Sequence, residues 1–134
     1  MPTPTEVVLE FCAMWEQPGG PDEAIRRYFT DRSIWENHGM AITTGQDEAI
    51  ALNAAFGEKF GMGTIWIEQL AVAETGNKVL TERIDHLRDR DGNSIGSFPV
   101  MGVFEVEGDK ILSWRDYFDT IPFASQQHPG STRG

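Results

Sequence analysis

The sequence predicts an α+β fold in which helices from the first half of the chain pack against one face of a curved β-sheet. Two observations predict it. Apolar residues recur at helical spacing in much of residues 5–60, and they alternate with polar residues from residue 64 onward. The length of 134 residues and the 40% hydrophobic content suit one globular domain. We expect that domain to span residues 1–125, followed by a flexible C-terminal tail at 126–134 that is rich in Gly, Pro, Ser and Thr.

Three helices are predicted in the first half. The first begins at Thr5, a residue suited to capping, and ends near Gln17, because the Pro-Gly-Gly run at 18–20 breaks a helix. A second helix spans residues 22–29, behind a proline placed where helices tolerate one. A third covers about residues 47–60 and ends at the glycines that follow.

Strands account for the rest of the predicted fold. Two short strands at 33–37 and 41–44 are separated by a turn at His38-Gly39. Four long strands follow, and the turn residues between them are typical of antiparallel hairpins. The long strands are residues 64–74, 78–88, 95–107 and 110–120.

The charge balance argues against two classes of partner. The chain has 21 acidic and 11 basic residues, and binding to nucleic acid or to an anionic membrane surface selects the opposite balance. Cys12 is the only cysteine, so no disulfide can form within the chain, and we expect a buried thiol. No cysteine–histidine spacing indicates a metal site, and neither a signal peptide nor a membrane span is indicated. We therefore expect a soluble, cytoplasmic protein.

One carboxylate stands out in the last predicted strand. Alternate residues of a strand share a face, so Leu112, Trp114, Asp116 and Phe118 lie together. Large apolar neighbours imply that this face is covered. An unpaired buried carboxylate costs several kcal/mol, so Asp116 needs a partner or a proton.

A partner is available on the second long strand. Arg83 and Asp85 share one of its faces, about 7 Å apart at roughly 3.3 Å per residue. A guanidinium can bridge two carboxylates, and one positive charge does not neutralise both. One acid can then be ionised while the other holds a proton, which suits paired base and acid catalysis. Periodicity alone leaves open a structural ion-pair network, or a turn cap at Asp116.

Three segments carry a family resemblance. They are Leu80–Asp85, Pro99–Phe104 and Trp114–Asp119, and together they resemble the limonene-1,2-epoxide hydrolase family. That family belongs to a wider group with the cone-like fold of nuclear transport factor 2, ketosteroid isomerases and SnoaL-type polyketide cyclases. The resemblance implies a cone-like, curved, mixed β-sheet with the N-terminal helices on its concave face.

The resemblance also implies a reaction. In the family, water opens an epoxide in one step without a covalent intermediate and without a metal or organic cofactor. Carried onto this chain, Asp116 is the general base, Asp85 is the general acid and Arg83 links them. The family holds the attacking water with a Tyr-x-Asn pair on the first short strand. Here that pair is Trp35 and Asn37, and because an indole offers only an N–H, the water site must differ from the family's.

Apolar residues in register with the acids are expected to form the wall of a lipophilic pocket, and the substrate is expected to be a small lipophilic epoxide. The expected wall residues are Leu87, Phe98, Val100, Leu112, Trp114, Phe118 and Phe123. The resemblance further suggests a homodimer formed through the outer face of the sheet.

Two other functions stay open at this point. One is an isomerase or polyketide cyclase of the same fold, in which an aspartate removes a carbon-bound proton. The other is a non-catalytic ligand-binding or dimerisation module, in which Arg83 and the two acids only stabilise the fold.

Overall fold

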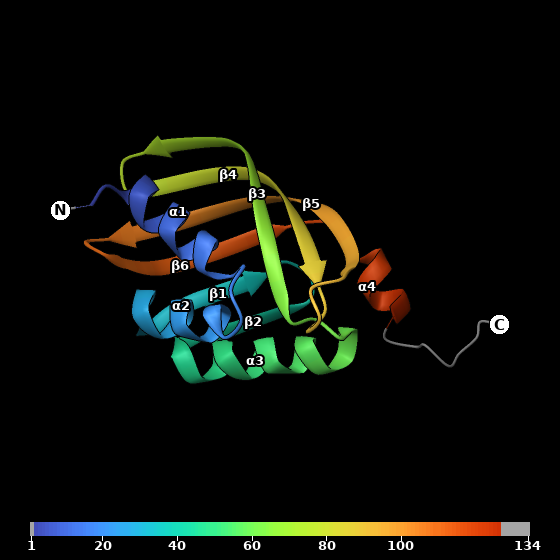
Figure 1. Cartoon of the computed structure of the whole chain (residues 1–134). Coiled ribbons are helices and arrows are strands. Elements are labelled where there is room, and N and C mark those ends of the chain that lie inside the picture. Colours follow the sequence, from blue (N-terminus) through green and yellow to red (C-terminus); the bar gives the residue numbers. More distant parts are fainter. Residues whose placement is uncertain (1, 127–134) are drawn as a thin grey trace.

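The structure, a computed structural model, describes residues 2–126 (Figure 1). Its four helices are α1 (Pro4–Met14), α2 (Gly20–Tyr28), α3 (Gly45–Phe60) and α4 (Ile121–Gln126). Its six strands are β1 (Phe29–Asn37), β2 (Ala41–Thr44), β3 (Thr64–Thr75), β4 (Lys78–Arg88), β5 (Ser94–Glu107) and β6 (Lys110–Tyr117).

The six strands form one mixed sheet. Their order is β2-β1-β6-β5-β4-β3, so β1 and β6 are neighbours although most of the chain separates them. These two strands run parallel, and every other neighbouring pair is antiparallel. Hairpins link β3 to β6 in sequence, as their turn residues predicted. The parallel β1–β6 pair matters most for function, because it brings residues near 37 beside residues near 116.

Helices cover one face of this sheet, and the sheet curves around α1 (Figure 1). Helix α1 contacts β3, β4, β5 and β6, whereas α3 contacts β1 and β2. The side chains of α1 that face the sheet are apolar and buried, and Cys12 is among them as expected. The expected α+β architecture is therefore confirmed.

Several boundaries differ from those predicted. Thr3, and not Thr5, caps α1: its side chain accepts from the Glu6 N–H while the Glu6 carboxylate accepts from the Thr3 N–H. Strand β1 starts at Phe29, directly after α2, and β6 ends at Tyr117. Helix α4 was not predicted, because six residues are too few to show a helical period.

Helix α4 follows β6 and lies near one end of the sheet (Figure 1). The predicted flexible tail, beyond residue 126, lies outside the described residues. Within residues 2–126, no helix combines the length and the apolar character that crossing a bilayer requires.

Candidate active site

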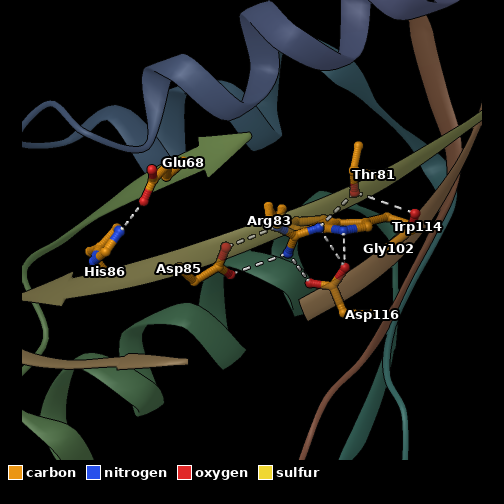
Figure 2. Close-up of polar contacts among 8 residues, drawn as sticks. All are labelled: Glu68, Thr81, Arg83, Asp85, His86, Gly102, Trp114 and Asp116. Atoms are coloured by element: carbon orange, nitrogen blue, oxygen red, sulfur yellow. Dashed lines mark hydrogen bonds and ion pairs between the residues drawn. The ribbon is translucent and has the colours of Figure 1, made fainter. Parts of the chain in front are cut away.

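The fold brings the acid–arginine–acid trio, Arg83, Asp85 and Asp116, together on the covered face of the sheet (Figure 2). Arg83 and Asp85 come from β4 and Asp116 comes from β6. Strand β5 runs between them, and Gly102 is the residue of β5 that pairs with Asp116. Because Gly102 has no side chain, the guanidinium of Arg83 can cross β5 to reach Asp116.

Arg83 uses all five of its N–H donors. Nε and Nη2 donate to Asp85 over 2.9 and 3.2 Å. Nη1 and Nη2 donate to Asp116 over 3.0 and 2.6 Å. The remaining Nη1 hydrogen points to Thr81 Oγ1 at 3.3 Å. Two carboxylates and one hydroxyl therefore satisfy the guanidinium completely, and its position is fixed.

The space at Gly102 is essential to this arrangement. A Cβ atom placed there would lie 2.4 Å from Arg83 Nη1 and 2.6 Å from Asp116 Oδ1. Both distances are shorter than any real contact of that kind. Glycine within a strand often marks such a close approach of other groups. Strand β5 therefore accommodates the Arg83–Asp116 contact only with glycine at 102.

Burial controls the electrostatics of the trio. The side chain of Arg83 is fully buried, and those of Asp85 and Asp116 are only 8% and 6% exposed. Burial by itself lowers the pKa of Arg83, but the charges of Asp116 and Asp85 together raise that pKa well above its ordinary value. For Asp116 burial prevails: it raises the pKa of the carboxyl although Arg83 acts in the opposite direction.

Asp116 also contributes to the wall of a largely apolar cavity between the sheet and the helices. The cavity has a volume of ≈ 60 Å³, several times the roughly 10–15 Å³ that one water needs by the same measure. Asp85 sits in the same layer, because its strand neighbours Ile67 and Phe98 both line the cavity. Five expected wall residues line it: Leu87, Phe98, Trp114, Phe118 and Phe123.

Two expected wall residues lie elsewhere. Val100 is buried beside Arg83, its partner on β4, and packs under the trio. Leu112 falls at a bulge where the register of β6 shifts, and Ile111 takes the fully buried position. The alternation of buried and outward-facing side chains along β6 therefore fails on the N-terminal side of Trp114, because the bulge adds one residue to the strand.

The two residues expected to position water both reach the cavity. Asn37 pairs directly with Asp116 across the parallel β1–β6 ladder and is almost fully buried. Trp35 is stacked on Trp114, with ring centroids 4.9 Å apart. The Trp35 indole N–H and the Asn37 amide nitrogen have no hydrogen-bond partner in the structure. Trp114 is more than an apolar wall residue, because its indole N–H donates to Asp116 Oδ1 over 2.7 Å.

Several site residues were not predicted. Thr81 and Gly102 carried a signal: a threonine among apolar residues on the Arg83 face, and a glycine inside a strand. The residues contributed by helices and by neighbouring strands carried none, because periodicity does not say which helix covers which part of a sheet. These additional cavity residues are Trp15, Met40, Asn53, Phe56, Phe60, Met62, Ile65 and Ile67.

A further polar contact on β4, made by His86, is separate from the trio (Figure 2). His86 lies on the opposite face, where its ring contacts Glu68 at 2.9 Å and Ser97 at 2.7 Å. That placement agrees with a structural role. Among residues 2–126, no three His, Cys, Asp or Glu side chains gather as a metal site would require.

Comparisons with known proteins identify the family. Residues 2–128 match the family described as the limonene-1,2-epoxide hydrolase catalytic domain. Among solved structures, the chain is similar to an LEH-like epoxide hydrolase of M. tuberculosis, with 25% identity and a TM-score of 0.72 over 92% of this chain and 83% of that one.

Two further likenesses concern the fold alone. One is an NTF2-like protein of unknown function from Burkholderia pseudomallei, with 16% identity and a TM-score of 0.75 over 94% of this chain and 98% of that one. The other is a putative SnoaL-like polyketide cyclase from Shewanella denitrificans, with 14% identity and a TM-score of 0.73 over 96% and 99%. The fold is therefore the NTF2-like and SnoaL-like one.

Proposed function

Because the chain belongs to the limonene-1,2-epoxide hydrolase family, we propose that it hydrolyses a lipophilic epoxide to a vicinal diol. The observation that carries the proposal is one buried arginine that donates two hydrogen bonds to each of two buried carboxylates, one of which lines an apolar cavity. A lipophilic substrate fits that cavity, and the acids supply both proton transfers.

The proposed reaction is a single step. A water oxygen attacks one epoxide carbon while Asp116 takes a proton from that water. The carbon–oxygen bond on the attacked side breaks, and the departing oxygen takes a proton from Asp85. The product is a diol, and the enzyme is left with the proton on Asp116 in place of Asp85. Return of that proton through solvent restores the starting state. General base and general acid catalysis each contribute about 10²–10⁴-fold.

The surroundings of Asp116 support its role as the base. A carboxylate with a raised pKa is a stronger proton acceptor than an ordinary aspartate, provided that it is ionised at the working pH. The Arg83 and Trp114 donors hold the ionised form in place. The Asp116 oxygens accept three hydrogen bonds, and a carboxylate has about four lone-pair positions, so one position is available for a water.

We propose that Asn37 and Trp35 hold that water. Asn37 pairs with Asp116 across the strands, and its amide nitrogen lacks a partner. A water bound there would accept from the Asn37 amide or from the Trp35 indole N–H and donate to Asp116. An indole N–H can donate but cannot accept, so Trp35 can only donate to a lone pair of the water. The direction in which the water points its own protons depends on Asp116 and Asn37.

The competing functions use less of this geometry. An isomerase or cyclase needs one base and one oxyanion donor, which gives no function to an arginine between two acids. A binding module needs the cavity but no acid in its wall. The full pairing of Arg83 with both acids therefore favours hydrolysis.

The test is a panel of terpene, styrene, cyclohexene and steroid epoxides incubated with the protein in ¹⁸O-water under single-turnover conditions. We expect diol that carries one ¹⁸O atom after the first turnover, because water attacks directly. Label that enters the protein before the diol would contradict direct attack. No diol from any epoxide would favour the cyclase or binding alternatives.

We also propose that two copies pair through the outer face of the sheet. That face carries exposed apolar side chains from four strands: Trp66, Leu80, Met101 and Tyr117. Light scattering on the purified chain should give twice the mass of one chain, which is 15.0 kDa. A mass of one chain at micromolar concentration would contradict the dimer.

A further inference from the structure

Unpaired polar atoms are concentrated at the cavity. Buried side-chain nitrogens and oxygens normally have a hydrogen-bond partner. Among the described residues seven such atoms lack one, and four of them belong to residues that line the cavity. The four atoms are Trp15 Nε1, Trp35 Nε1, Asn37 Nδ2 and Asn53 Oδ1.

Two of the four have a role in the proposed hydrolysis, and two do not. Trp35 and Asn37 are on β1, the strand beside Asp116, where they would hold the attacking water. Trp15 and Asn53 come from the helices that cover the sheet: Trp15 caps the end of α1 and Asn53 is in the middle of α3. Hydrolysis at the trio therefore leaves this second pair unexplained.

Asn53 also lies where the cavity meets a polar surface groove. Asn53 and Met62 line both the cavity and this neighbouring groove. The groove contains charged side chains of both signs, among them Glu58, Asp89 and Arg90. The cavity thus has an acid-bearing wall on the sheet and a second polar end at α3, close to a polar surface.

The chemistry of the second pair indicates what it binds. An indole N–H can only donate and a carboxamide oxygen can only accept, whereas an alcohol hydroxyl does both. A hydrocarbon ligand would leave both groups buried without a partner, and sites built for a hydroxyl reject analogues that lack it.

We propose that the substrate is an epoxide that also carries a hydroxyl group away from the epoxide ring, and that Trp15 and Asn53 bind this hydroxyl. The epoxide part of this inference rests on the proposed hydrolysis, whereas the hydroxyl part rests on Trp15 and Asn53 alone. Its product is a triol, and the reaction that supplies the substrate is the epoxidation of an unsaturated alcohol or the hydroxylation of an epoxide.

The test measures binding without turnover. Cyclohexanol and methylcyclohexane, which have similar shapes, are titrated into the intact protein and followed by amide chemical shifts. The variants are Trp15→Phe, which keeps an aromatic ring but removes the indole N–H, and Asn53→Leu, which keeps a side chain of similar size but removes the amide oxygen. We expect each variant to weaken cyclohexanol binding about tenfold while methylcyclohexane binding changes less than about twofold. Trp66→Phe, on the outer face, is the matched control and should change neither.

Equal changes for the two ligands would overturn the proposal, because the variants would then act on shape. No change for either ligand would also overturn it. That second result is expected if the Trp15 N–H points at the ring of Trp35 or Trp114, both of which stand edge-to-face with Trp15.

A kinetic comparison separates this inference from the hydrolase proposal. The epoxide of cyclohex-3-en-1-ol should exceed the epoxide of 4-methylcyclohexene in kcat/KM, and both variants should reduce that ratio. If neither epoxide reacts while the binding result holds, hydrolysis fails and the hydroxyl site stands.

Discussion

Two ion pairs on opposite faces of the sheet involve consecutive residues of β6. Arg115 points outward and pairs with Glu105 at 2.8 Å, whereas Asp116 points inward and pairs with Arg83 at 2.6 Å. The outer side chains are 27% and 29% exposed, and the inner ones are 0% and 6% exposed. The contacts are nearly equal in length, so the main difference between them is their access to water.

Because of that difference in access to water, the pKa values of the two carboxylates shift in opposite directions. The hydrogen bond from Arg115 lowers the pKa of Glu105, because burial, which acts in the opposite direction, is slight near the surface. Burial raises the pKa of Asp116 although its arginine is closer. An exposed pair of this kind contributes about 0–1 kcal/mol to stability, whereas breaking a buried pair costs about 3–5 kcal/mol. The carboxylate of the inner pair, Asp116, is therefore the one suited to act as a general base.

The largest effect is expected when the inner cation is removed. Arg83→Met leaves two buried carboxylates without a counter-charge and should lower the free energy of unfolding by about 3–5 kcal/mol at pH 7. Both acids would then take up protons more readily when folded than when unfolded, so the loss should shrink as the pH falls. Urea denaturation at pH 7 and pH 5 measures both effects. A loss below about 1 kcal/mol at pH 7 would make the inner pair equivalent to the outer one.

A smaller effect is expected from closing the space over which the inner pair meets. Gly102→Ala places a methyl group against Arg83 Nη1 and Asp116 Oδ1. Overpacking of this kind costs about 1–3 kcal/mol, and displacing the base by about 1 Å costs on the order of 10²-fold in rate. Urea denaturation and kcat/KM with the best epoxide measure the two losses. Unchanged kcat/KM would show that the Arg83–Asp116 contact is dispensable.

The opposite pKa shifts predict a pH dependence. The base must be ionised, so kcat/KM should fall about tenfold per pH unit below the pKa of Asp116, with a midpoint above the ordinary value of 3.8. Initial rates between pH 4 and pH 8 locate that midpoint. Glu105→Gln serves as the control and should leave it in place. A midpoint at or below 3.8 would show that burial does not govern the pKa of the catalytic base, Asp116.

The smallest effect is expected on the outer face. Glu105→Gln removes one charge from an exposed pair and should change the free energy of unfolding by less than about 1 kcal/mol. The effect should diminish further at high salt. Urea denaturation at low and high ionic strength is the measurement. A loss as large as that of Arg83→Met would remove the distinction between the two faces.

Much of the fold could be predicted because local rules determine it. Period-two patterns and turn residues located β3 to β6 within a few residues, and helix breakers located α1 to α3. Helix α4 and the bulge at Leu112 were missed, since each is a local exception that shows no period. The parallel pairing of β1 with β6 was not predicted, because no local pattern links residues so distant in the sequence, and the family resemblance implied only that the sheet is mixed.

The site residues likewise divide into those that local sequence patterns predict and those that only the folded structure shows. Arg83, Asp85 and Asp116 were identifiable as charged residues on covered faces, and the structure brings them together. Asn53 and Trp15 could not be found, because a polar group on a helix is ordinary until a neighbouring cavity leaves it without a partner. Gly102 shows the intermediate case, in which the residue type was visible but the reason for it lies on the two neighbouring strands, β4 and β6.

The central claim is that the inner pair is catalytic and not only structural, and Asp116→Asn tests it most directly. Asparagine keeps an oxygen to accept from Arg83 and Trp114, and Asp85 still balances the charge of Arg83, but the amide cannot take a proton from water. We expect kcat/KM for the best epoxide to fall about 10²–10⁴-fold, while the free energy of unfolding by urea changes by less than about 2 kcal/mol. A variant that keeps kcat/KM within tenfold of the parent, or one that loses about 3 kcal/mol or more of stability, would contradict the account.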